Sequence, residues 1–222
     1  MQIYKILYLC AMDIEKIIKT ISTERFSPYQ KRYPNDIEKS FLLYQSNIEI
    51  SQAFYSNLSI LEVTLRNSIS NSMQRHFKTE NWLDKLPVDL KFQTVEIQKR
   101  LENANKAVTI DRVIAELNFG FWTSMFNRKY AKFLWKPLLK SFPNIPHDYR
   151  KRTKVSSRLN HIRTFRNRIY HYEPIIWDIQ EIVNKRKEIF AIISWIEPNT
   201  EIWARQIDTF EKTRQKIRTN LP

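Results

Sequence analysis

The chain has 222 residues, of which 42% are hydrophobic and 13% aromatic, which is enough apolar material for a substantial core and excludes a disordered chain. Its 37 lysine and arginine residues outnumber 23 acidic residues, and the net charge of +14 points to a polyanionic partner, RNA or DNA before a membrane surface. The single glycine, Gly120, argues against hairpins and glycine-rich phosphate loops, so we expect an all-α fold.

The scarcity of cysteine limits the disulfides and metal sites that the chain can form and indicates its cellular compartment. One cysteine, Cys10, excludes an internal disulfide and a multi-cysteine zinc site, and it fits the reducing environment of the cytoplasm. The four histidines are scattered and no paired-aspartate loop is present, so we expect no metal and no other cofactor. No run of about 18 apolar residues occurs, so we expect no membrane-spanning segment.

Helical periodicity covers most of the chain. A helical pattern over residues 3–21 is followed by a connector with two prolines at residues 22–35. Residues 36–77 then predict one very long helix, or two that meet at a kink near Ser56 and Asn57. Further helices are expected at residues 89–107, 110–118, 147–172, 177–196 and 200–218. Together these patterns predict a bundle of about seven or eight helices.

Two local signals lie in the middle of the chain. Thr109 is a good N-cap for the short helix at residues 110–118, and Gly120 stands where a glycine commonly ends a helix. Residues 119–135 hold many aromatic side chains, which we expect to form core and loop packing in preference to a platform for stacked bases.

The most suggestive chemistry lies in residues 159–176, LNHIRTFRNRIYHYEPII. On one helix, Asn167 and His171 would lie on the polar side, with Arg166 at its boundary. The apolar side would hold Leu159, Ile162, Phe165, Ile169 and Tyr172. An arginine and a histidine at this spacing arise about once by chance in such a chain, so the pattern alone leaves a structural or solvent-facing His171 open.

The same stretch resembles the Abi-like (abortive infection) family, a branch of the HEPN superfamily. Residues 61–67 (LEVTLRN) and 115–122 (AELNFGFW) resemble it too, in the same order. Its N-terminal pattern is matched by Ser22, Arg25, Phe26, Tyr44 and Asn47. The resemblance implies a HEPN-like domain at residues 35–198, with an N-terminal helix and connector at residues 1–34 and a C-terminal helix at residues 199–222 packed on the same domain.

In function, the resemblance implies a metal-independent endoribonuclease that serves as a toxin or anti-phage effector. Arg166 matches the family arginine, Asn167 the polar residue after it and His171 the family histidine. Two such helices would form one composite site across a homodimer, and a noncoding RNA would be a plausible antitoxin. Many superfamily members keep the fold and only bind, so the alternative is a non-catalytic RNA-binding or regulatory protein. A DNA-binding protein is disfavoured, since no helix-turn-helix is recognisable.

These residue types suit cleavage of RNA by its own 2′-hydroxyl. Histidine transfers protons near neutral pH, and arginine offers a charged, planar fork for phosphate oxygens. Asn167, one turn before His171, would orient the imidazole or hold a phosphate oxygen.

Other charged residues are candidates for supporting roles. Those expected to grip the RNA backbone, or equally to be solvated surface, are Arg163, Arg168, Lys151, Arg152, Lys154 and Arg158. Glu62, Arg66 and Asn67 form a second polar cluster, which we expect to be a buried or interfacial charge pair in preference to a catalytic group.

Overall fold

The computed structural model describes residues 12–221, and every element of regular structure in that range is helical, which confirms the all-α fold. The α-helices are α2 (Ile14–Ile21), α3 (Thr23–Gln30), α4 (Ile37–Gln52), α5 (Tyr55–Phe77), α6 (Val88–Asn103), α7 (Ile110–Glu116), α8 (Phe119–Ser124), α9 (Ala131–Leu139), α10 (Arg152–Tyr170), α11 (Ile179–Ile196), α12 (Pro198–Ile207) and α13 (Phe210–Asn220). Short 3-10 helices are η1 (Trp82–Lys85), η2 (Arg128–Tyr130) and η3 (His147–Tyr149). No helix in residues 12–221 is both long enough and apolar enough to cross a bilayer.

The expected connector at residues 22–35 is wrong, because most of it is helix α3. Ser22 ends α2 with a φ of 91° and starts α3 by accepting a hydrogen bond from the Arg25 amide. Phe26 and Tyr29 of α3 are fully buried, and this burial outweighs the hydrogen bond lost at Pro28 in so short a helix. The first part of the helix expected at residues 3–21 lies outside the described residues.

The long pattern at residues 36–77 forms two helices, α4 and α5, as the second of the two alternatives predicts. The break falls at Ala53 and Phe54, just before the expected kink. Both residues are buried, and the Phe54 ring lies 5.4 Å from the ring of Phe210.

The C-terminal helix expected at residues 200–218 is also two helices. Pro198 begins α12, where its missing N–H costs nothing. The chain breaks again at Asp208 and Thr209, and Phe210 at the start of α13 is fully buried. Because this helix divides and because α3, α8 and α9 were not expected, the described part of the chain has more helices than expected.

The expected role of Gly120 is wrong. It lies inside α8, which Asn118 caps by accepting a hydrogen bond of 3.0 Å from the Phe121 amide. A Cβ atom at Gly120 would lie 2.9 Å from Asn118 Oδ1, closer than real Cβ atoms come. Glycine therefore leaves room for the cap; it supplies no positive φ.

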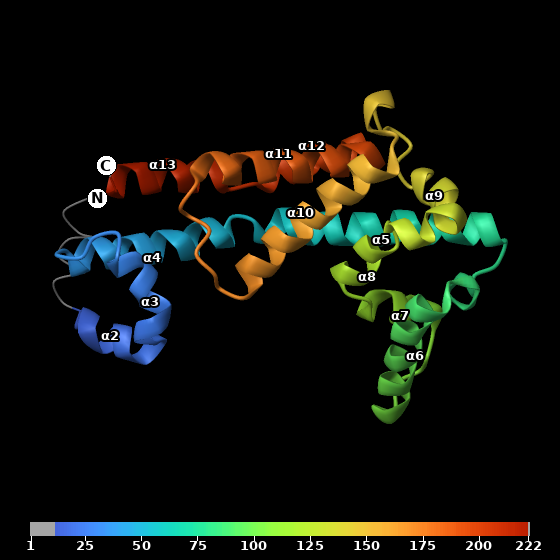
Figure 1. Cartoon of the computed structure of the whole chain (residues 1–222), viewed down its shortest axis with the longest axis horizontal. Coiled ribbons are helices and arrows are strands. Elements are labelled where there is room, and N and C mark those ends of the chain that lie inside the picture. The colour runs from blue at the N-terminus through green and yellow to red at the C-terminus, as the bar shows by residue number, and fades with distance from the viewer. Residues whose placement is uncertain (1–11, 222) are drawn as a thin grey trace. The chain divides into compact units, whose positions relative to one another are not determined.

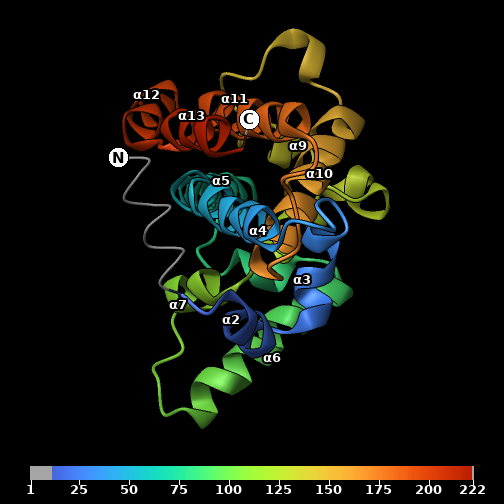
Figure 2. The same ribbon diagram turned by 90° about the vertical axis from the view of Figure 1, so that its left-hand side faces the viewer.

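The described residues form two compact units. The terminal unit comprises residues up to Tyr55, Arg168–Ile182 and residues from Asp208 on. In it α3 and α13 pack on α4, and α2 packs on α3 (Figures 1 and 2). Lys216 of α13 pairs with Glu49 of α4 at 2.7 Å.

The central unit comprises Ser56–Asn167 and Val183–Ile207. Two side-chain hydroxyl groups connect α5 to α9 and to the residues that follow α9. Ser72 donates a hydrogen bond to the Pro137 carbonyl and Ser68 donates one to the Ser141 carbonyl, each at 2.7 Å. Buried residues of α10 are Val155, Leu159, Ile162 and Phe165. The aromatic segment supplies buried Phe119, Phe121, Trp122, Phe126 and Tyr130, so the expected core packing is largely confirmed, although Phe133 is exposed.

The close approach at Gly120 predicts a conditional effect of Gly120→Ala. In the native chain the new methyl group displaces the Asn118 cap, which costs about 1 kcal/mol and cancels a helix-propensity gain of about 1 kcal/mol. In an Asn118→Ala background no cap remains to lose, so the same substitution should stabilise by about 0.5–1 kcal/mol. Chemical denaturation of the four chains measures this. Equal effects in both backgrounds would contradict the close approach.

Candidate functional site

Helix α10 ends one residue before His171, so the expected helix at residues 147–172 is too long at both ends. Its start is the separate turn η3. At its end the Tyr172 amide donates to the Ile169 carbonyl at 3.1 Å and the Glu173 amide to the Arg168 carbonyl at 2.9 Å. This pair of bonds is a Schellman motif, in which Tyr172 has a φ of 58° and His171 is the C-cap residue.

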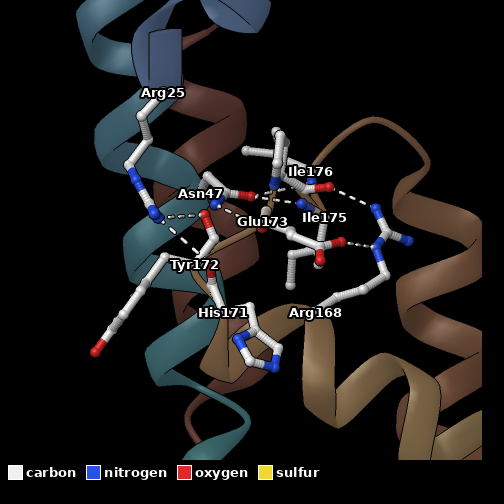
Figure 3. Close-up of polar contacts among 9 residues, drawn as sticks. Arg25, Asn47, Arg168, His171, Tyr172, Glu173, Ile175 and Ile176 are labelled. Atoms are coloured by element: carbon white, nitrogen blue, oxygen red, sulfur yellow. Dashed lines mark hydrogen bonds and ion pairs between the residues drawn. The ribbon is translucent and has the colours of Figure 1, made fainter. Parts of the chain in front are cut away.

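Arg25 and Arg168 hold the backbone that follows the helix (Figure 3). Arg25 Nη1 donates to the carbonyl oxygens of His171 (3.3 Å) and Tyr172 (3.4 Å). The guanidinium of Arg168 donates to the Pro174 carbonyl and pairs with Glu173 at 3.5 Å. Cations at the C-terminal end of a helix also interact favourably with its dipole.

Asn47 of α4 fixes the rest of the segment. Its Oδ1 accepts hydrogen bonds from the amides of Ile175 (2.7 Å) and Ile176 (3.2 Å), and its Nδ2 donates to the Glu173 carbonyl at 3.4 Å. Asn47 is only 4% exposed, so these bonds are shielded from water. Each of the six residues 171–176 is therefore hydrogen-bonded to one of three side chains, and two of these, Arg25 and Asn47, lie more than 120 residues away in the sequence.

The His171 imidazole is not part of this network. The side chain is exposed, and in Figure 3 its ring extends away from the bonded carbonyl groups with no drawn contact. The result is an exposed imidazole on a backbone with a fixed course, which is how a group that transfers protons to a bound molecule is best presented.

Arg166 lies in the central unit and is half-buried. Its Nη2 pairs with Glu62 Oε2 at 3.0 Å, and each side chain is 22% exposed. The guanidinium carbon lies 5.9 Å from the centre of the Phe119 ring, a cation–π arrangement.

Both other stretches that carry the family resemblance meet at Arg166. Glu62 comes from residues 61–67 and Phe119 from residues 115–122. Arg66 joins the same two stretches, because its Nη1 donates to the Ala115 carbonyl at 3.4 Å. Asn67 is exposed. Glu62 pairs with Arg166, which lies outside the expected cluster of Glu62, Arg66 and Asn67.

The predicted site residues fall into both units. Arg166 and Asn167 belong to the central unit, His171 and Arg168 to the terminal unit, and Asn167 is exposed. Within residues 12–221 no three His, Cys, Asp or Glu side chains lie close enough together to hold a metal ion.

The basic residues expected to grip RNA differ in their surroundings. Lys151 and Lys154 are exposed, and the Lys154 ammonium lies 5.4 Å from the Tyr149 ring. Arg152 donates to the Phe126 carbonyl at 2.8 Å, and Arg158 lies over the Tyr149 ring at 4.4 Å. Arg163 is half-buried. Arg152 and Arg168 thus have structural contacts of their own.

Sequence reasoning assigned no role to Arg25 and Asn47. Both fit the N-terminal pattern of the resemblance, and that signal could have marked them. Their actual role is to bond backbone groups more than 120 residues away, which no local pattern predicts.

The Glu62–Arg166 pair predicts a strong coupling in stability. Arg166→Ala leaves a half-buried carboxylate without its partner and should destabilise by about 1–3 kcal/mol. The double variant Glu62→Ala/Arg166→Ala should be less destabilised than the sum of the single variants by about 1 kcal/mol or more. Denaturant unfolding of all four chains gives the coupling. Additive effects would show that the pair contributes nothing.

Asn47 and Arg25 should differ in their contribution to the free energy of unfolding. Asn47→Ala leaves three shielded backbone groups without partners and should cost about 2–4 kcal/mol, whereas exposed Arg25→Ala should cost about 1 kcal/mol or less. Amide hydrogen exchange at Ile175 and Ile176 should accelerate in Asn47→Ala. Asn47→Asp keeps the acceptor oxygen and is the matched control, in which these two amides should stay more protected. Unchanged exchange in Asn47→Ala would contradict the role given to Asn47.

Comparisons with protein-family models, curated proteins and solved structures find no match for this chain. A function for the chain must therefore be argued from its own residues. The two features that such an argument can use are the exposed imidazole of His171 on its fixed backbone and the half-buried Arg166 with its Glu62 and Phe119 neighbours.

Proposed function

We propose that this protein is a metal-independent endoribonuclease that acts as a toxin or abortive-infection effector against phage. The observation that carries the proposal is the exposed His171 imidazole on a backbone fixed by Arg25, Asn47 and Arg168. Three unrelated parts of the chain supply bonds to this short segment, although its most reactive side chain takes part in none of them. That arrangement suits a group whose partner is a bound molecule.

The proposed chemistry uses the 2′-hydroxyl of the RNA as the nucleophile. His171 moves a proton to or from the reacting oxygens. Arg166 stabilises the charge of the phosphorane, and Asn167 holds a phosphate oxygen or orients the imidazole. The 2′-oxygen forms a bond to phosphorus as the bond to the 5′-oxygen breaks, which gives a 2′,3′-cyclic phosphate and a 5′-hydroxyl.

The proposed working form is a homodimer with a composite site. Cleavage needs one proton removed, one delivered and a charge stabilised, and one arginine–histidine pair offers few groups for all three tasks. Two pairs, one from each chain, suffice. The strongly positive chain also suits a noncoding RNA antitoxin that keeps the enzyme inactive in the host cytoplasm.

A second function is favoured by the ion pair at Arg166. Because Glu62 already neutralises the guanidinium in the central unit, Arg166 also suits a purely structural role. The chain would then be a non-catalytic RNA-binding or regulatory protein. Cleavage assays separate this alternative from the first proposal.

His171→Ala is the sharpest test of catalysis, since the imidazole is exposed and its loss should leave thermal unfolding unchanged. We expect the wild-type protein to cleave single-stranded RNA in the presence of EDTA and the variant to be slower by a factor of about 100 or more. His161→Ala removes another exposed histidine of α10 and should cleave like the wild type. End mapping and gel analysis of total RNA give the rates and the cyclic phosphate ends.

A 2′-deoxy residue at the mapped cut site should make the substrate inert. Cleavage of that substrate, or a requirement for Mg²⁺, would exclude the proposed mechanism. RNA binding without any cleavage by the wild-type protein would favour the non-catalytic alternative.

A further inference from the structure

The terminal unit contains a cavity of about 870 Å³ beside the segment that carries His171. Four tyrosines contribute to its wall, from α4, α5 and the end of α10. The residues that line the cavity include Arg25, Tyr44, Gln52, Tyr55, Tyr170 and Tyr172. Among the residues of the described range 12–221 that line the cavity, none is acidic and Arg25 is the one cation. The cavity is within the range of ligand sites, which is about 300–1,000 Å³.

Tyr172 in this wall has an unusual conformation. Its φ of 58° is left-handed, a region that glycine adopts freely and that a residue with a Cβ atom adopts only with strain. Its side chain is 74% exposed, so core packing does not explain why an aromatic residue stands here. The Schellman end of α10 accounts for the backbone conformation, whereas the exposed ring remains available to a bound molecule.

A residue that lines the cavity is adjacent to His171 in the chain. Tyr172 follows His171 directly, and one nitrogen, Arg25 Nη1, bonds the carbonyl groups of both residues. The Arg25 guanidinium also lies 5.6 Å from the centre of the Tyr172 ring. A molecule in the cavity would therefore contact Tyr172, the residue directly after His171.

We propose that this cavity binds an unpaired base of single-stranded RNA, stacked on Tyr172 and Tyr55, and so places a neighbouring phosphate at His171. The inference rests on the proposed function for the identity of that phosphate. Tyrosine faces stack on any base, and the Gln52 amide, on the exposed rim, offers donors and an acceptor for a base edge. The presence of Arg25, and the lack of acidic side chains among the described residues of the lining, suit a polyanionic strand.

Binding of uncleavable strands tests the cavity apart from catalysis. The probes are a short 2′-O-methyl oligouridine, the corresponding oligoadenosine, and a strand of the same length with 2′-O-methyl ribose phosphates and no bases. None can be cut by 2′-hydroxyl attack, so the wild-type chain is used. Stacking predicts that strands with bases bind about tenfold or more tightly than the strand without bases.

Tyr55→Ala and Tyr172→Gly should each reduce this preference severalfold, and the double variant should abolish it. Tyr172→Gly also relieves the left-handed strain, so its melting temperature should be unchanged or higher, which separates lost binding from lost folding. Tyr172→Phe keeps the stacking face and should keep the preference. Phe92→Ala is the matched control outside the cavity: Phe92 is 63% exposed and Tyr55 is 65% exposed.

Three results would overturn the proposal: no preference for bases in the wild type, a preference that survives in the double variant, or loss of self-association in the tyrosine variants with the preference intact. The last result would assign the cavity to a second copy of the chain. Failure of the proposed function looks different. In that case the tyrosine variants lose the base preference as expected, whereas the wild type cleaves no RNA.

Discussion

The end of α10 is governed by the requirement that buried backbone groups find hydrogen-bond partners. Where the helix stops, its last carbonyl groups and the amides of the next residues lose their helical partners. The two Schellman bonds satisfy two amides and two carbonyl groups, and Arg25, Arg168 and Asn47 satisfy six more backbone groups. The same bonds that allow the chain to leave the helix also fix the course of residues 171–176, so the presentation of His171 follows from satisfying the backbone.

The position of Arg166 depends on charge compensation. A guanidinium as enclosed as that of Arg166 is costly without a nearby anion, and Glu62 supplies one. The Phe119 ring adds a face that accepts the positive charge. Arg166 therefore has a defined orientation before any ligand binds. The effect of an Arg166 substitution on the free energy of unfolding has to be measured before its effect on activity can be interpreted.

The sequence predicts the fold class well because helical periodicity and the single glycine are global signals. It also predicts the Thr109 cap and most of the buried aromatic residues, which depend on local chemistry. It fails where tertiary burial decides: Phe26 and Tyr29 make a helix of a proline-containing connector, and the buried Phe210 lies at the break that divides the pattern at residues 200–218. For the site, residue types nominate Arg166 and His171, but the bonds of Asn47 and Arg25 connect residues more than 120 positions apart and leave no local trace.

The terminal unit is assembled from three pieces of the chain: its first part, the segment after α10, and α13. During synthesis the N-terminal piece leaves the ribosome first, but α13, which packs on α4, follows only after about 160 further residues. The bonds that fix the backbone of His171 need residues 168–176, which are made more than 120 residues after Asn47. Until those residues have been made, Arg25 and Asn47 lack the backbone groups that they bond, so the N-terminal helices alone do not carry the folded form of this segment.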